Sequence, residues 1–206
     1  MAHNNYVVGY ENKIYRLKET GLYNLDIDGE YSSLTAKYLV VETYDGLLLL
    51  LLFNCIDRDY EGGLSRFVSL ANTLDRHMVL PIFPCYVKER PETECNLCGH
   101  QPINCHKDIM RRAKLSWKEH VFFHNKNVPD IVKQDYLNAP TLFLCLDEYC
   151  CEQSKQRTNR DSECIILKSN VLTGRSIRKA LRHFIDDRVI RINYIPPGLV
   201  DNLYID

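Results

Sequence analysis

The feature that most constrains the fold is the run Leu47–Phe53, which reads Leu-Leu-Leu-Leu-Leu-Leu-Phe. This run is too short to span a bilayer, which takes about 20 apolar residues. A short apolar run without polar alternation is typical of a strand buried on both faces, as in a sheet that helices cover. The run therefore predicts the central strand of an α/β protein.

The segment before this run predicts its partner strand. Tyr38–Tyr44 is rich in β-branched and aromatic residues, which favour strands. Asp45-Gly46 lies between the two segments, and Asp-Gly between two apolar runs is a strong hairpin signal. We therefore expect Tyr38–Tyr44 to pair antiparallel with Leu47–Phe53.

The segment after the run predicts a helix and a second strand. Apolar residues recur at helical spacing from Leu64 to Leu74. Met78–Val87 then reads as a strand, and we expect it at a sheet edge because Pro81 and Pro84 cannot donate to a ladder. Strand, helix and strand together predict a βαβ unit.

The rest of the chain predicts shorter elements. Thr173 or Ser176 can cap a clearly amphipathic helix over 176–186. The other expected elements are a hairpin at Tyr6–Leu17, a helix at Asp108–His124, a short helix from Asp130 to Tyr136, and strands at Thr141–Leu146, Cys164–Leu167 and Val189–Tyr194.

This element order, β-α-β-α-β-β-α over about 47–187, resembles the thioredoxin-like superfamily. The segment Tyr136–Leu144, which reads Tyr-Leu-Asn-Ala-Pro-Thr-Leu-Phe-Leu, is similar to that family's passage from a helix through a cis-proline into a strand. The resemblance implies an α/β (α+β) fold with a mixed central sheet flanked by helices, and Pro140 as the cis-proline. The family's redox Cys-x-x-Cys is absent, because the matching stretch 57–61 reads Asp-Arg-Asp-Tyr-Glu and Cys55 stands alone nearby.

The expected organisation has three parts. Residues 1–36 form an N-terminal extension with a β-hairpin and an acidic loop. Residues 37–194 form the thioredoxin-like domain, with a Cys- and His-rich insert at about 88–124. Residues 195–206 form an apolar and acidic C-terminal tail.

The insert carries the most specific chemical signal. Cys95 and Cys98 lie in a Cys-x-x-Cys-Gly turn that resembles a zinc knuckle, and Cys105 follows closely. A structural zinc ion needs four ligands, and it would supply folding energy to a segment that has few apolar residues. We expect His106 as the fourth ligand; the alternatives are His100, His120 and His124.

Charge and cysteine content bound the location and the partners. The formal net charge is −1, so nucleic acid is not favoured as a partner and would need a local basic patch. We find no signal peptide or membrane span and expect an intracellular protein in which most of the nine cysteines are free thiols, metal ligands or redox groups. Four of them are expected to be buried inert thiols, with a second metal cluster as the alternative: Cys145, Cys150, Cys151 and Cys164.

These observations favour a non-catalytic, zinc-stabilised module that binds a protein partner or joins a larger assembly. The tail suits docking on such a partner. One alternative is a thiol-disulfide oxidoreductase that uses Cys95 and Cys98. The other is a metal-dependent phosphoryl-transfer enzyme or nuclease that uses Asp57, Asp59 and Glu61.

Overall fold

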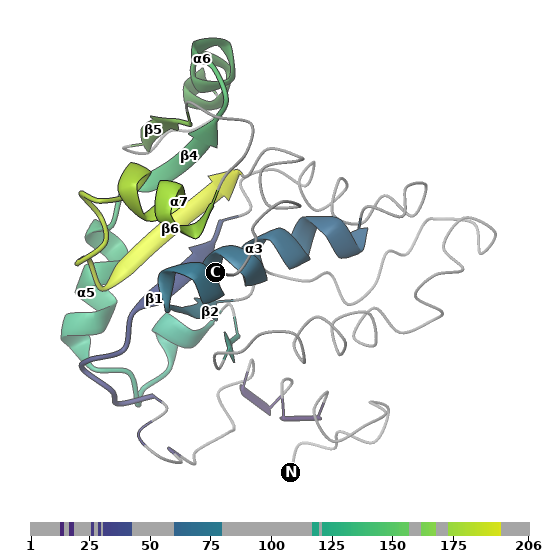
Figure 1. Ribbon diagram of the computed structural model, residues 1–206. Helices are drawn as coiled ribbons and strands as arrows, with labels where there is room; N and C mark the ends of the chain where they lie inside the picture. Colours follow the sequence, from purple (N-terminus) through teal and green to yellow (C-terminus); the bar gives the residue numbers. More distant parts are fainter. Residues whose placement is uncertain are drawn as a thin grey trace.

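One parallel sheet organises the molecule. The computed structural model describes residues 13–14, 17–18, 26, 29, 31–42, 60–79, 117–119, 121–156, 162–167 and 173–194. Within these residues six strands form a single sheet in the order β3-β2-β1-β6-β4-β5, and every strand pair is parallel (Figure 1). Helices cover the sheet, so the expected α/β class is confirmed.

The strands and helices of this sheet are short. The strands are β1 (Tyr38–Val41), β2 (His77–Val79), β3 (Trp117–Lys118), β4 (Thr141–Cys145), β5 (Ser162–Ile166) and β6 (Val189–Tyr194). The α-helices are α3 (Tyr60–Leu74), α5 (Asp130–Asn138), α6 (Glu148–Gln156) and α7 (Gly174–Ala180), and Phe122–His124 forms the 3-10 helix η2.

Strand β1 is the centre of the sheet. All four of its residues are buried, and it pairs with β2 on one side and β6 on the other. Its side chains alternate between two cores. Leu39 and Val41 pack with α3 and α7, whereas Tyr38 and Val40 pack with η2 and α5. The sheet is therefore the middle layer of three.

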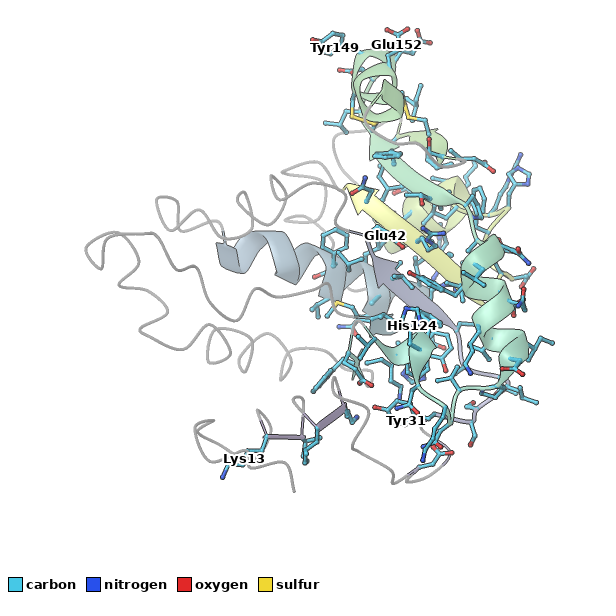
Figure 2. All side chains as sticks on the ribbon, turned by 180° about the vertical axis from the view of Figure 1, so that it is seen from behind. Lys13, Tyr31, Glu42, His124, Tyr149 and Glu152 are labelled. Carbon is cyan, nitrogen blue, oxygen red and sulfur yellow. A yellow bond between two sulfur atoms is a disulfide. The ribbon has the colours of Figure 1, made fainter. Side chains whose placement is uncertain are left out.

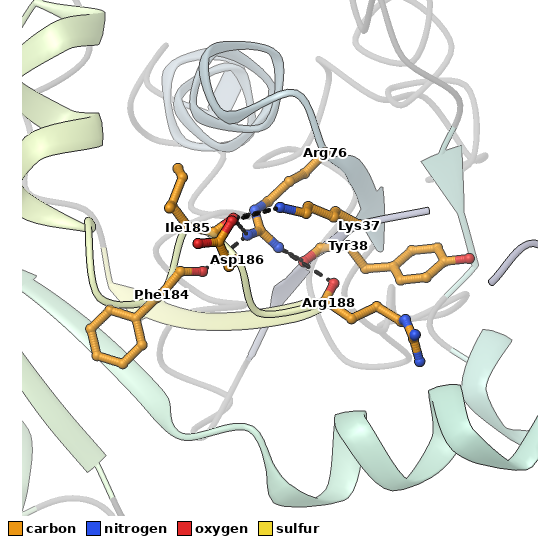
Figure 3. A network of polar contacts seen from close by, with 7 residues as sticks. All are labelled: Lys37, Tyr38, Arg76, Phe184, Ile185, Asp186 and Arg188. Carbon is orange, nitrogen blue, oxygen red and sulfur yellow. Dashed lines mark hydrogen bonds and ion pairs between the residues drawn. The ribbon is translucent and has the colours of Figure 1, made fainter. Parts of the chain in front are cut away.

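A buried arginine fixes the start of β1 (Figure 3). Arg76 follows α3 and is 0% exposed. Its guanidinium donates hydrogen bonds of 3.0 to 3.4 Å to four backbone carbonyls. These carbonyls belong to Tyr38, Phe184, Ile185 and Arg188. One side chain thus joins the end of α3 to β1 and to the turn that leads from α7 into β6.

Several local predictions are confirmed. The expected helix over 64–75 is α3, the helix that opens at Asp130 is α5, and Val189–Tyr194 is β6. The strands expected near 141 and 164 are β4 and β5. Thr173 caps α7, since its Oγ1 accepts a hydrogen bond from Ser176 N at 3.2 Å, although α7 ends at Ala180 rather than at 186.

The predicted strand pairing is wrong in three respects. Tyr38–Val41 has parallel neighbours on both sides, so it has no antiparallel hairpin partner. His77–Val79 lies between β1 and β3 rather than at an edge. The described sheet is parallel rather than mixed, because α6 separates β4 from β5 and returns the chain for a parallel pairing.

Three further local predictions are wrong. The segment expected as a helix up to His124 contains β3 and η2. No peptide bond among the described residues is cis, so Pro140 is not a cis-proline. Lys13, Ile14 and Leu17 are helical, although a hairpin was expected at Tyr6–Leu17. Several predicted features lie outside the described residues: the run Leu47–Phe53, Pro81, Pro84 and most of the insert.

Candidate metal centre

Four cysteines meet at one corner of the sheet. Cys145 is the last residue of β4, Cys150 and Cys151 lie in the first turn of α6, and Cys164 is the middle residue of β5. In the parallel register, Cys164 is opposite Phe143, whose side chain shares a face of β4 with Cys145. These four residues, which we call the cysteine corner, come from three consecutive elements.

Asp147 sets the position of the two helical cysteines. Its Oδ1 accepts a hydrogen bond from Cys150 N at 2.8 Å, which is the pattern of an N-cap residue. Because Asp147 follows β4 by only two residues, α6 begins close to the end of the strand. The cap therefore brings the Cys-Cys pair back to the sulfur of Cys145.

The sulfur atoms are paired as two disulfides (Figure 2). Cys145 is bonded to Cys150 with a Cα–Cα separation of 5.6 Å, and Cys151 is bonded to Cys164 with a separation of 5.7 Å. Both separations are normal for disulfides. The expectation of inert free thiols is therefore wrong for these four residues.

The same corner also has the geometry of a metal site. The Sγ atoms of Cys145, Cys151 and Cys164 all lie within 4.8 Å of one another. Tetrahedral zinc with Zn–S bonds of about 2.3 Å holds its sulfurs about 3.8 Å apart. These three cysteines could therefore hold a metal ion, and the Cys145–Cys150 bond brings a fourth sulfur to the same place.

The surroundings of the corner favour a structural role. Cys145 is 0% exposed and Cys151 is 7% exposed, and Phe143 packs against both. The positive end of the α6 dipole favours negative charge on nearby sulfurs. Tyr149 and Glu152 point away from the sheet on the outer side of α6 (Figure 2). The sulfurs thus lie between the helix and the strands.

The site residues predicted in the insert cannot be placed beside this corner. Cys95, Cys98, Cys105 and His106 lie outside the described residues, as do His100, His120, Asp57 and Asp59. Glu61 lies in α3, but its side chain is not described. His124 is exposed in the 3-10 helix η2, where an α-helix was expected.

A second buried polar cluster lies just after β3. Glu119 is 0% exposed, and its two carboxylate oxygens share the hydrogen bond that Tyr31 Oη donates, at 2.8 and 3.0 Å. Burial raises the pKa of Glu119, and the hydrogen bond from Tyr31 and the charges of Lys18 and Lys118 lower it by less. Because Tyr31 is also 0% exposed, this carboxyl group is closed to solutes.

The sequence contained a signal for the cysteine corner. Asp147 two residues after a buried strand is an N-cap candidate, and a helix there places Cys150 and Cys151 in its first turn. No helix was predicted over 148–162, because this segment is polar. None of the helices that the structure describes is both long and apolar enough to cross a membrane. No family model, curated protein or solved structure matches the chain.

Proposed function

We propose that the chain is a non-catalytic binding module whose β4–α6–β5 unit is stabilised by a zinc ion in the cysteine corner. One observation carries the proposal: three sulfurs from three different elements lie within 4.8 Å of one another. A buried site of this kind joins the edge of the sheet to a nine-residue helix. It would supply folding energy where β5 is only partly buried.

The donor set supports zinc and a structural role. Soft thiolate ligands select zinc, copper(I) or iron-sulfur clusters over hard cations. Four thiolates complete a tetrahedral shell, whereas a catalytic zinc keeps one position open for water or substrate. With Cys145 and Cys151 buried, the corner supports a closed site rather than a reactive one.

Zinc and the disulfides compete for the same sulfurs. Two equivalents of a dithiol reductant convert the two disulfides to four thiols and become two disulfides themselves. Four thiols then release four protons when their sulfurs bind one Zn²⁺. We therefore expect zinc binding only by reduced protein.

The test is zinc content after purification with reductant and without chelator. We expect Cys145→Ser with Cys151→Ser to lower the zinc content by about one ion per chain. The matched control is Cys95→Ser with Cys98→Ser, which reports separately on the zinc site predicted in the insert. Unchanged zinc content in the Cys145 and Cys151 variant contradicts the proposal.

A second candidate is a thiol-disulfide oxidoreductase. The observation that favours it is the disulfide between Cys145 and Cys150, in which Cys150 is only partly buried at the start of a helix. An insulin-reduction assay separates the two candidates. Turnover that Cys150→Ser abolishes supports the oxidoreductase, and an inactive wild-type protein excludes it.

The narrower predictions from the sequence stay predictions. The thioredoxin-like assignment gains no support from the parallel pairing of β4 and β5, and the proposal does not depend on it. Phosphoryl transfer by Asp57, Asp59 and Glu61, redox chemistry at Cys95 and Cys98, and a protein partner for the tail all rest on side chains outside the described residues.

A further inference from the structure

The small net charge of the chain conceals a strongly basic segment. Residues 164–185 contain five Lys and Arg residues and no Asp or Glu, which leaves 21 basic and 27 acidic residues in the rest of the chain. Helix α7 and the turn after it carry four of these five cations: Arg175, Arg178, Lys179 and Arg182. This is the local patch that a polyanion would require.

The patch forms one side of a well-anchored helix. Arg175, Arg178 and Lys179 lie at positions i, i+3 and i+4 of α7, and all three are exposed. The opposite side of the helix carries Ile177, and Leu181 follows it into the core beneath. The helix therefore divides cleanly into an apolar buried side and a basic outer side.

Contacts with α3 hold this basic side in place. Arg178 donates from Nε and from a terminal nitrogen to the carbonyl oxygen of Thr73, at 3.0 and 2.7 Å. A Cβ on Gly174 would approach Thr73 Cγ2 to 3.2 Å, so glycine permits the close contact between the two helices. Since the Thr173 cap fixes the start of α7, the cations project from a rigid support.

Carboxylates of the described residues do not neutralise the outer cations. Among the described residues, no carboxylate forms an ion pair with Arg175, Lys179 or Arg182. The next acid along the chain, Asp186, pairs with Lys37 at 3.6 Å. Arg182 is exposed and donates from Nε to His183 Nε2 at 3.1 Å. The positive charge is thus available to an external partner.

We propose that this basic face of α7 binds the phosphate backbone of a nucleic acid. The proposal names a partner for the binding module and rests on that proposed function. Guanidinium groups match phosphate oxygens with paired donors, which favours a phosphate-bearing polymer.

Two other polyanions fit this surface less well. A membrane-binding helix places large apolar side chains beside its cations, whereas the apolar residues of α7 are buried in the core. An acidic protein would complete its interface with apolar or aromatic contacts, and the outer side of α7 offers only basic and small polar residues. Contact through phosphates alone requires neither.

The experiment measures binding of a fluorescent 20-nucleotide DNA, single-stranded and duplex, by anisotropy across a series of salt concentrations. For duplex, each phosphate contact contributes about −0.9 to the slope of log K against log salt concentration. We expect Arg175→Gln with Arg182→Gln to make the slope shallower by about 1.8 and to weaken binding at least tenfold at low salt.

The matched control is Lys126→Gln with Lys133→Gln, which removes the same charge from the α5 side of the sheet. We expect it to preserve the slope. Equal effects of both variants, or no binding by the wild-type protein at low salt, overturn the proposal. Binding of labelled polyglutamate or of phosphatidylserine vesicles as tightly as DNA also overturns it, in favour of an acidic protein or a membrane.

Failure of this proposal is distinguishable from failure of the zinc site. Leu142 and Leu144 of β4 face the α7 side, whereas Phe143 and Cys145 face the cysteine corner. The two features therefore lie on opposite faces of the sheet. The α7 variant should keep its zinc, and loss of zinc should leave the cations of α7 in place.

Discussion

Arg76 and the cysteine corner each join several elements of the fold, but by different chemistry. Arg76 joins α3, β1 and the turn before β6 through hydrogen bonds from one guanidinium to four carbonyls. The cysteine corner joins β4, α6 and β5 through four sulfurs. The first lies next to the central strand, and the second lies at the β5 end of the sheet.

The difference concerns what each connection requires from its surroundings. Burial lowers the pKa of Arg76 to about 10, and the charges of Asp186 and Asp187 partly oppose this, so the guanidinium stays charged at neutral pH. The four sulfurs instead require an oxidant or a metal ion. Reductants and chelators should therefore not change the stability of the centre of the sheet. They should lower the stability of its β5 edge.

The largest expected effect is the loss of the Arg76 guanidinium. Arg76→Met leaves the buried carbonyls of Tyr38, Phe184 and Ile185 without this donor, and each unsatisfied buried group is costly. Since each such carbonyl costs about 1–3 kcal/mol, we expect the free energy of unfolding to fall by about 3–5 kcal/mol, measured by urea denaturation.

The control for this prediction is Arg182→Met, which removes an exposed guanidinium from the turn after α7. It should change the free energy of unfolding by less than about 0.5 kcal/mol. A loss of similar size in both variants would mean that the buried hydrogen bonds of Arg76 are not what stabilises the centre.

The second effect is local opening of the cysteine corner. Reductant together with EDTA removes both the disulfides and any bound metal, and we expect a loss of about 2–4 kcal/mol. Hydrogen exchange should accelerate for the amides of Leu144 and Ile165, while those of Leu39 and Val41 stay protected. Equal acceleration across β1 and β5 would show that the two regions unfold as one unit.

These two regions also differ in how far the sequence could reveal them. Val189–Tyr194 and the Thr173 cap depend on neighbouring residues, and both were predicted from local pattern. The neighbours of Tyr38–Val41 are β2 and β6, which come from distant parts of the chain. The nearby Asp45-Gly46 signal favoured a hairpin. In the structure, Tyr38–Val41 pairs instead with these two distant strands.

The sequence indicated a metal cluster at the corner only as an alternative to inert thiols, for a related reason. Each cysteine, taken alone, looks like a small buried hydrophobic residue. The four cysteines come together because α6 forms in a polar segment, where no helix was predicted, and because β5 pairs parallel with β4. Likewise, Trp117–Lys118 forms a strand only because Met78 and Val79 provide its partner. Contacts of this kind are set by the whole fold rather than by local propensity.

A third prediction concerns Glu119, a buried group whose contribution to stability depends on pH rather than on redox state. Burial raises its pKa above the ordinary value of 4.5, so the folded protein binds a proton there more tightly than the unfolded chain does. Stability from this group is present below pH 4.5 and is lost as the pH rises through the raised pKa. Glu119→Gln should remove this downward slope, measured by urea denaturation at several pH values; an unchanged slope contradicts it.

The smallest effect concerns the cap of α7, which contacts neither connection directly. Thr173→Ala removes the side-chain acceptor of Ser176 N, and caps of this kind contribute about 1 kcal/mol. Thr173→Ser keeps the hydroxyl and should restore most of that stability.

Because Arg76 donates to carbonyls of the turn after α7, the cap and Arg76 are linked through one short helix. A double variant with Arg76→Met should therefore lose less than the sum of the two single changes, whereas a double variant with Cys151→Ser should be additive. If both double variants are additive, the cap of α7 does not affect the hydrogen bonds of Arg76.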